Sequence, residues 1–127
     1  MDHMKNFPIR GREDALTAIR GGAIQSVTIE GGSVTFVIAN HGNTLEIGAL
    51  GEVELKEGGG EGRNIFSFIT DDVSRLIGSQ IADVLVEDSG LTIETETPRW
   101  TITLQPGVDY AAEISCVTRS KDTAFFY

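Results

Sequence analysis

The sequence contains only one cysteine, Cys116, among its 127 residues. A single cysteine cannot form a disulfide within the chain, so the fold must be stabilised by a buried core, as is usual in a reducing compartment. The chain has no apolar run near the roughly 20 residues that a membrane-spanning helix needs. Residues 1–11 also contain no apolar segment of the kind found in signal peptides. These absences predict a soluble, cytoplasmic protein.

Basic residues are also scarce. Residues 22–117 contain 15 acidic residues and only four basic ones, a net charge of −11 in a chain whose total is −9. Proteins that bind nucleic acid or anionic membranes need a basic surface to displace counterions from phosphate or to approach the lipid headgroups. We therefore expect no nucleic-acid partner and no membrane partner. The excess of carboxylates favours a cationic partner, a metal or simple solubility.

Residues that usually carry catalysis or bind metals are few. His41 lies in an expected turn, and Cys116 alternates in phase with apolar residues, which favours a packing role. The glycine-rich residues 58–62 are not followed by the Gly-Lys-Ser or Gly-Lys-Thr of a phosphate-binding loop, and no calcium-loop motif is present. We therefore expect no catalytic residue, no cofactor and no bound metal.

An offset of 57 positions aligns the two halves of the chain without a gap. The aligned positions share glycines, acids and apolar residues over more than 30 positions, which favours a tandem duplication over a chance match of two strand-rich segments. The matching pairs include Asp14–Asp71, Leu16–Val73, Gly21–Gly78, Ile24–Ile81, Val27–Val84, Thr35–Thr92, Leu45–Ile102 and Ile47–Leu104.

The alignment defines the expected organisation of a single domain over residues 1–127. Repeat 1 spans about 13–56, a glycine-rich linker spans 57–64, repeat 2 spans about 70–117, and an apolar tail spans 118–127. Residues 65–69 either add a ninth short strand or lead into the second helix.

Each repeat is predicted to contain one short helix followed by four strands. Acids in the first turn and a glycine at the end indicate helices near 13–21 and 70–78. Period-two alternation predicts the strands and gives each repeat an antiparallel meander with one apolar face. Because that face must be buried, we expect an α+β fold, mostly antiparallel β, with the two meanders packed face to face or closed into a barrel. The expected inward residues are Val27, Ile29, Val34, Phe36, Ile38, Leu45, Ile47, Val53 and Leu55 in repeat 1, and Val84, Val86, Leu91, Ile93, Trp100, Ile102, Leu104, Tyr110, Ala112, Ile114 and Cys116 in repeat 2.

The first predicted hairpin of repeat 2 carries acids on its outward side. Asp83 and Glu87 share one strand, Glu94 and Glu96 share the next, and Arg99 follows the turn after it. A turn at residues 88–90 places Asp83 opposite Glu94 or Glu96, although like charges opposite one another destabilise a sheet. We interpret these five residues as a docking surface for a positively charged partner. The alternative is a solvated face whose charges maintain solubility and prevent edge pairing.

The chain ends in an apolar segment that includes Phe125, Phe126 and Tyr127. Such residues are unfavourable in water, so the tail is expected either to dock on the core or to contact another chain. The second possibility would make the protein a homo-oligomer.

In size, acidity, strand-rich layout and lack of a catalytic motif, the chain resembles small bacterial immunity proteins. These are acidic cytoplasmic inhibitors that neutralise toxin domains, often nucleases. The chain is also similar to uncharacterised β-rich bacterial domains. The resemblance carries over no individual residue, and it implies a non-catalytic module that binds a basic protein partner. The alternatives are a homo-oligomeric structural or assembly protein, and a small-ligand binder or enzyme with a pocket between the repeats.

Overall fold

The computed structural model describes residues 12–31, 33–40, 42–49, 51–67, 73–87, 90–96, 99–107, 112–117 and 122–127. These residues form two antiparallel sheets and one short α-helix, α1 (Arg12–Ile19), with a 3₁₀ helix, η1 (Ile65–Ser67). The strands are β1 (Ala23–Glu30), β2 (Ser33–Asn40), β3 (Asn43–Ala49), β4 (Val53–Glu57), β5 (Arg63–Asn64), β6 (Ile81–Glu87), β7 (Gly90–Thr95), β8 (Trp100–Leu104), β9 (Ala112–Val117) and β10 (Asp122–Phe126).

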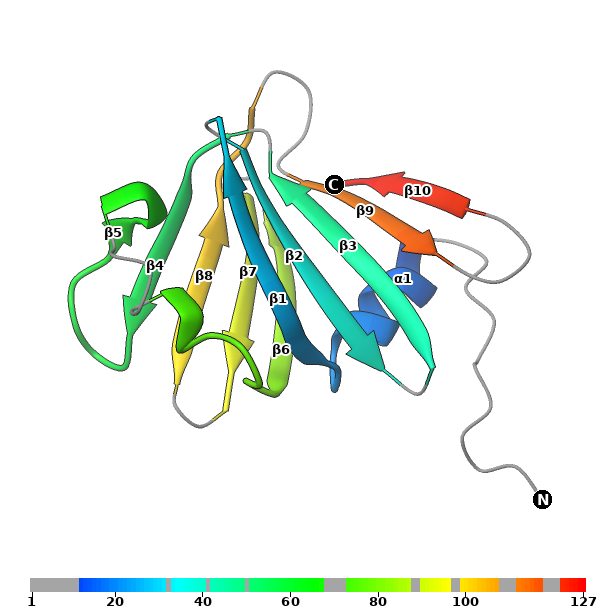
Figure 1. Cartoon of the computed structure of the whole chain (residues 1–127), viewed down its shortest axis with the longest axis horizontal. Helices are drawn as coiled ribbons and strands as arrows, with labels where there is room; N and C mark the ends of the chain where they lie inside the picture. The colour runs from blue at the N-terminus through cyan, green and yellow to red at the C-terminus, as the bar shows by residue number, and fades with distance from the viewer. Residues whose placement is uncertain are drawn as a thin grey trace.

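The strands divide equally between the two sheets. Sheet A has the order β1-β2-β3-β9-β10, and sheet B has the order β5-β4-β8-β7-β6 (Figure 1). Helix α1 contacts β2 and β10 of sheet A and β6 of sheet B, so it bridges the two sheets. The expectation of a mostly antiparallel β fold is therefore confirmed, and the described residues contain one short α-helix. Closure into a barrel is not observed among the described residues.

The expectation that each half forms its own four-stranded meander is wrong. Strand β4 pairs with β8, and β9 pairs with β3, so each half contributes one strand to the other half's sheet. The chain leaves sheet A after Ala49 and enters sheet B at Val53; it returns between Leu104 and Ala112. Strands that follow one another usually pair, but the exchange allows the apolar faces of both halves to share one continuous core.

The two halves meet where β1 and β6 begin. The amide of Gly21 donates a hydrogen bond to the carbonyl of Ile81 at 2.9 Å, and the amide of Gly78 donates one to the carbonyl of Ile24 at 2.7 Å. The offset that aligns the two halves places Gly21 on Gly78 and Ile24 on Ile81. The two bonds are therefore reciprocal.

A second reciprocal pair completes this junction. The amide of Ile24 donates to the carbonyl of Ser79 at 2.9 Å, and the amide of Ile81 donates to the carbonyl of Gly22 at 2.8 Å. The same offset places Gly22 on Ser79, so donors and acceptors again correspond. The four bonds fix the edge strand of sheet A to the edge strand of sheet B.

The offset of 57 positions holds through the first hairpin of each half and then ends. The β1–β2 and β6–β7 pairs have the same register, including an irregularity at the same place. In the next hairpin, Phe36 is paired with Ile47, whereas its counterpart Ile93 is paired with Ile102 instead of Leu104. The expected alignment of Ile47 with Leu104 is therefore wrong in β8.

Most of the expected inward residues form the core. Those of β2, β3, β4, β7 and β8 are buried, and so are Ala112 and Ile114 of β9. Ile29 and Val86 do not follow the expectation, because their side chains are 37% and 50% exposed. Both lie near the ends of the edge strands β1 and β6, where the alternation of the sequence continues but a neighbouring strand covers only one side.

The predicted linker at 57–64 is partly strand. Glu57 completes β4, and Arg63–Asn64 form β5, which pairs with β4. The next residues form η1, so a ninth strand beginning at Ile65 is not observed. These differences arise because the chain pairs locally with the exchanged strand β4 before it enters the second half.

Only part of the predicted second helix lies within the described residues. Val73 and Ser74 are helical, and the chain then turns as far as Gly78. The proposed helix start at residues 70–72 lies outside the described residues. The side chain of Arg75 fixes this turn to sheet B: its guanidinium lies 5.6 Å from the centre of the Trp100 ring and forms an ion pair with Glu57.

The tail docks on its own chain. Strand β10 pairs with β9, and Tyr127 exchanges backbone hydrogen bonds of 2.9 and 3.0 Å with Ala112. Tyr127 is also partly buried against the core. Of the two expectations for the tail, docking on the core is observed. Phe125 and Phe126 belong to β10, and only their backbone is described.

The reciprocal junction predicts a specific glycine requirement. Gly21 and Gly78 have φ angles of 87° and 90°, a conformation that costs an L-residue with a side chain about 1–2 kcal/mol. We expect Gly21→Ala and Gly78→Ala each to lower the free energy of unfolding by about 1–2 kcal/mol in urea denaturation. The matched control is Gly59→Ala, because Gly59 has open space around it and no left-handed φ, and this variant should differ from wild type by less than about 0.5 kcal/mol. Equal effects at all three glycines would contradict the prediction.

Candidate functional site

The outer face of sheet B, the side that faces away from the core, carries Asp83 and Glu94. Of the other predicted acids, Glu87 ends β6 at the turn of the hairpin, and Glu96 follows the end of β7 at its opposite end. The burial of β7, β8 and β4 alternates, so every second side chain of these strands lies on that face. Strand pairing aligns the outer residues in two rows. The first row is Asp83, Glu94, Thr101 and Lys56, and the second is Leu85, Thr92, Thr103 and Glu54.

Asp83 lies directly opposite Glu94, as the sequence predicted. The repulsion between these carboxylates is relieved from outside the hairpin. Arg20, which follows α1, donates through Nε to Asp83 Oδ1 at 3.1 Å and through Nη2 to the carbonyl of Val84 at 3.1 Å. Asp83 Oδ1 also accepts a hydrogen bond from the amide of Val84 at 2.8 Å. Asp83 is therefore held in a defined position.

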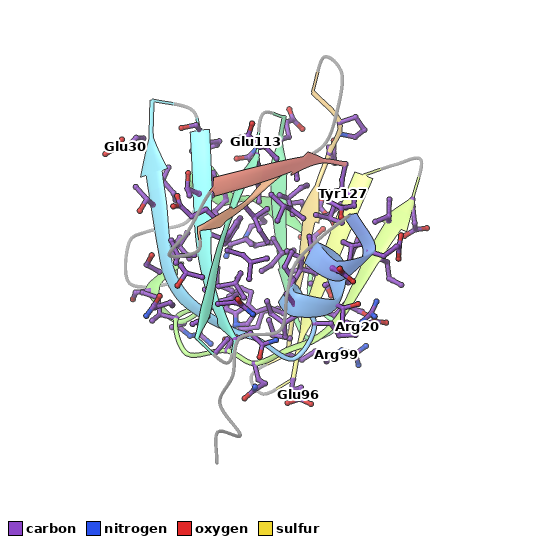
Figure 2. The ribbon with its side chains drawn as sticks, turned by 90° about the vertical axis from the view of Figure 1, so that its right-hand side faces the viewer. Arg20, Glu30, Glu96, Arg99, Glu113 and Tyr127 are labelled. Carbon is purple, nitrogen blue, oxygen red and sulfur yellow. The ribbon has the colours of Figure 1, made fainter. Side chains whose placement is uncertain are left out.

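Arg99 interacts with Glu94 more loosely. Its Nη2 lies 3.9 Å from Glu94 Oε2, and its side chain is 70% exposed. At this distance Arg99 relieves only part of the repulsion between Asp83 and Glu94. Glu87 and Glu96 are both exposed, and neither forms an ion pair with another described residue. Figure 2 shows Arg20, Arg99 and Glu96 near one another at one end of the molecule.

Sequence reasoning missed three residues of this face: Arg20, Glu54 and Lys56. Glu54 and Lys56 belong to β4 and reach the face only because β4 is exchanged into sheet B. Arg20 is separated from Asp83 by 63 positions, and only the packing of α1 brings the two together. One signal in the sequence could have pointed to Arg20. The offset of 57 positions aligns Arg20 with Ile77, and each residue directly precedes a glycine of the junction, so Arg20 lies close to the other half.

The face is therefore less acidic than the hairpin alone. Five carboxylates, at Glu54, Asp83, Glu87, Glu94 and Glu96, lie with three cations, Arg20, Lys56 and Arg99, which leaves a formal charge of −2. The centre of the face consists of threonines that are half-buried. This arrangement provides a largely polar surface with carboxylates around it.

The sequence offered two further candidate residues, His41 and Cys116. His41 lies outside the described residues. Cys116 lies in β9, where its backbone is paired with that of Leu45. Only the backbone of Cys116 is described. The described residues contain no group of histidine, cysteine or carboxylate side chains that would hold a metal ion. No helix among the described residues is long and apolar enough to cross a membrane.

Comparison with known proteins adds no relative: the chain matches no protein-family model, no curated protein and no solved structure.

The two arginines of the face should differ in their effect on stability. Arg20→Ala removes a hydrogen-bonded ion pair and a bond to a backbone carbonyl, so we expect the free energy of unfolding to fall by about 1 kcal/mol. Arg99→Ala removes a long, exposed ion pair and should change it by less than about 0.3 kcal/mol. Urea denaturation of both variants provides the comparison. A loss at Arg99 equal to that at Arg20 would contradict the geometry described above.

Proposed function

We propose that the chain is a non-catalytic protein-binding module that receives a basic protein partner on the outer face of sheet B. The observation that carries the proposal is the convergence of carboxylates from three strands, β4, β6 and β7, on the outer face of one sheet. A sheet face with a hydrogen-bonding centre suits a protein surface better than a small molecule.

The charge distribution supports a basic partner. Glu87 and Glu96 are exposed and are not paired with another described residue, so their charges are available for a partner. The excess of negative charge over the whole chain would increase the rate of encounter with a cationic surface. Arg20 holds Asp83 in place, and Arg20 and the more distant Arg99 limit the repulsion that an unpaired acidic hairpin would suffer.

The specific form that we propose is an immunity-type inhibitor that covers the active surface of a basic toxin domain. The small size of the chain, its acidity and its strand-rich fold agree with the resemblance drawn from the sequence. Such a protein would bind its partner one to one and would inhibit it by occupying its surface.

We also propose that the chain arose by duplication of a single unit, with the offset of 57 positions as its period. The reciprocal bonds between Gly21 and Ile81 and between Gly78 and Ile24 support this origin, as does the common register of the first hairpins. After duplication the two halves would have diverged, and only the second half gained Asp83, Glu94 and Glu96.

A homo-oligomeric assembly protein is the second candidate, and one observation favours it. Strand β10 is the edge of sheet A, so its outer side is available for pairing with another strand. A second copy that paired there would bring Phe125, Phe126 and Tyr127 to the contact. The net charge of −9 on each copy opposes this association at low ionic strength.

Charge reversal on the proposed face tests the binding function. The tagged protein is first used to capture a basic protein from the lysate of its host, and the affinity for that protein is then measured. We expect the double variant Glu87→Lys/Glu96→Lys to weaken binding by at least about tenfold, mainly through slower association, and the association rate of the wild type to fall with added salt.

The matched control is Glu30→Lys/Glu113→Lys. It changes the net charge by the same amount, and Glu30 and Glu113 belong to β1 and β9 of the other sheet, sheet A. This control should bind within about twofold of the wild type if the outer face of sheet B is the site. Equal weakening by both double variants would show that only the total charge matters and would overturn the proposed site.

A further inference from the structure

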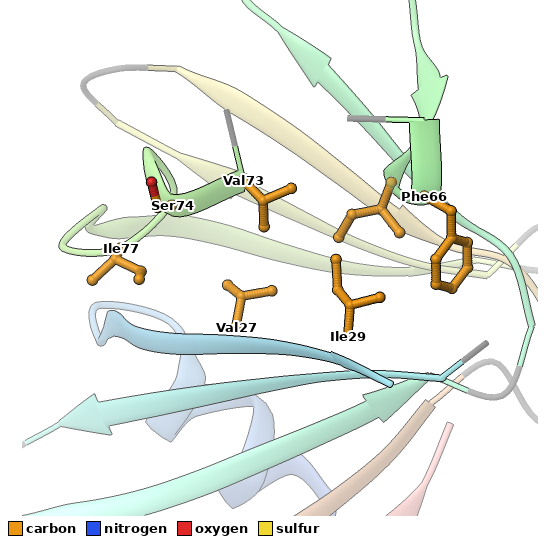
Figure 3. A pocket seen from close by; sticks show the side chains of 7 residues that line it. Val27, Ile29, Phe66, Val73, Ser74 and Ile77 are labelled. Carbon is orange, nitrogen blue, oxygen red and sulfur yellow. The ribbon is translucent and has the colours of Figure 1, made fainter. Parts of the chain in front are cut away.

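A second surface, separate from the acidic face, has the chemistry of a ligand site. A groove of about 470 Å³ is lined by six described residues with apolar side chains, Val27, Ile29, Ile65, Phe66, Val73 and Ile77, and by Ser74. Figure 3 shows the side chains of Val27 and Ile29 on one wall, facing Val73 and Ile77 on the other, with Phe66 at one end. Among the described residues there are five exposed large apolar side chains, and three of them, Ile29, Phe66 and Ile77, line this groove.

The walls of the groove are held by the fold. Val27 and Ile29 belong to β1, whose start is fixed by the reciprocal bonds to residues 78–81. On the opposite wall, Ile65 is fully buried and Val73 is 7% exposed. Arg75 fixes that wall to sheet B through Trp100 and Glu57. The groove is therefore a preformed concavity, which is typical of small-molecule sites.

The corresponding place in the other half is closed. The counterpart of Ile77 in the first half is Arg20, which is bonded to Asp83 and to the carbonyl of Val84 on β6. Val84 is only 3% exposed, whereas the matching Val27 is half-buried and lines the groove. In the first half, the polar side chain of Arg20 covers the edge strand β6. At the matching position beside β1, the exposed Ile77 leaves a groove. The packing of the two sheets does not by itself require this groove.

The described lining indicates the class of ligand. None of the described residues that line the groove carries a charge, and Figure 3 shows the hydroxyl of Ser74 pointing away from the apolar side chains. The net charge of −11 over residues 22–117 also disfavours an anion. We propose that this groove binds an uncharged, largely hydrocarbon small molecule, such as an aromatic compound or an alkyl alcohol. A second copy of the chain is a poorer occupant, because each copy carries a charge of −9.

The test uses the full chain and the neutral fluorescent probe N-phenyl-1-naphthylamine. We expect saturable binding of one probe per chain, with an increase in fluorescence as the probe leaves water. The variant Ile77→Arg introduces at this site the residue found at the matching position of the first half, and it should weaken binding by at least about tenfold. Ile29→Lys, on the opposite wall, should have a similar effect.

Leu85→Arg is the matched control. Leu85 is an exposed apolar residue of similar exposure, 40%, but it lies on the outer face of sheet B and outside the groove. This variant should bind the probe as the wild type does. Circular dichroism and the thermal midpoint establish that each variant is folded; if Ile77→Arg does not fold, the Ile29→Lys result stands in its place.

Competition tests the charge class of the ligand. Decanol should displace the probe, and decanoate, which has the same chain length with a negative charge, should do so at least about tenfold less well. Displacement by decanoate as efficient as that by decanol would overturn the proposed class. Two results would overturn the site itself: a loss of binding in Leu85→Arg equal to that in Ile77→Arg, or no saturable binding in the wild type. A wild-type dimer that Ile77→Arg converts to a monomer would overturn the proposed ligand and show instead that a second copy covers the groove.

Discussion

Four reciprocal backbone hydrogen bonds where β1 and β6 begin are the constraint on which the rest of the structure depends. They join the edge of one sheet to the edge of the other, so the two sheets have a fixed relation before any side chain contributes. The geometry needs a left-handed residue shortly before each edge strand, and Gly21 and Gly78 supply it. With these edges fixed, the exchange of β4 and β9 allows both sheets to bury their apolar faces in a single core.

The same constraint explains why the two proposed surfaces differ. Each half supplies a short helical segment that ends at the junction, and the last side chain of that segment lies beside the edge strand of the other half. In the first half this side chain is Arg20, which holds Asp83 and supports the acidic face. In the second half it is Ile77, which leaves an apolar groove beside Val27. Exchange of β4 then adds Glu54 to the acidic face. Two different surfaces thus arise from one repeated arrangement.

Local patterns in the sequence were sufficient for most of the strands and for most of the core. Alternation placed Leu45 and Trp100 inside, and both are buried, because the period of a strand determines which face a side chain occupies. The partners of the strands were not predictable in this way. The chain between Ala49 and Val53 is short enough for a hairpin, and the choice between a hairpin and a crossing depends on the whole core. Arg20 was missed for the same reason, since its contact with Asp83 spans 63 positions.

The most direct test of this account is native-state hydrogen exchange of four amides, those of Gly21, Ile24, Gly78 and Ile81. If the junction is the constraint that joins the halves, these amides will exchange only through global unfolding, and all four will report the same free energy as the amides of the central strands. If the members of one half exchange through local opening, at a lower free energy than those of the other half, the junction does not join the two sheets and the account is wrong.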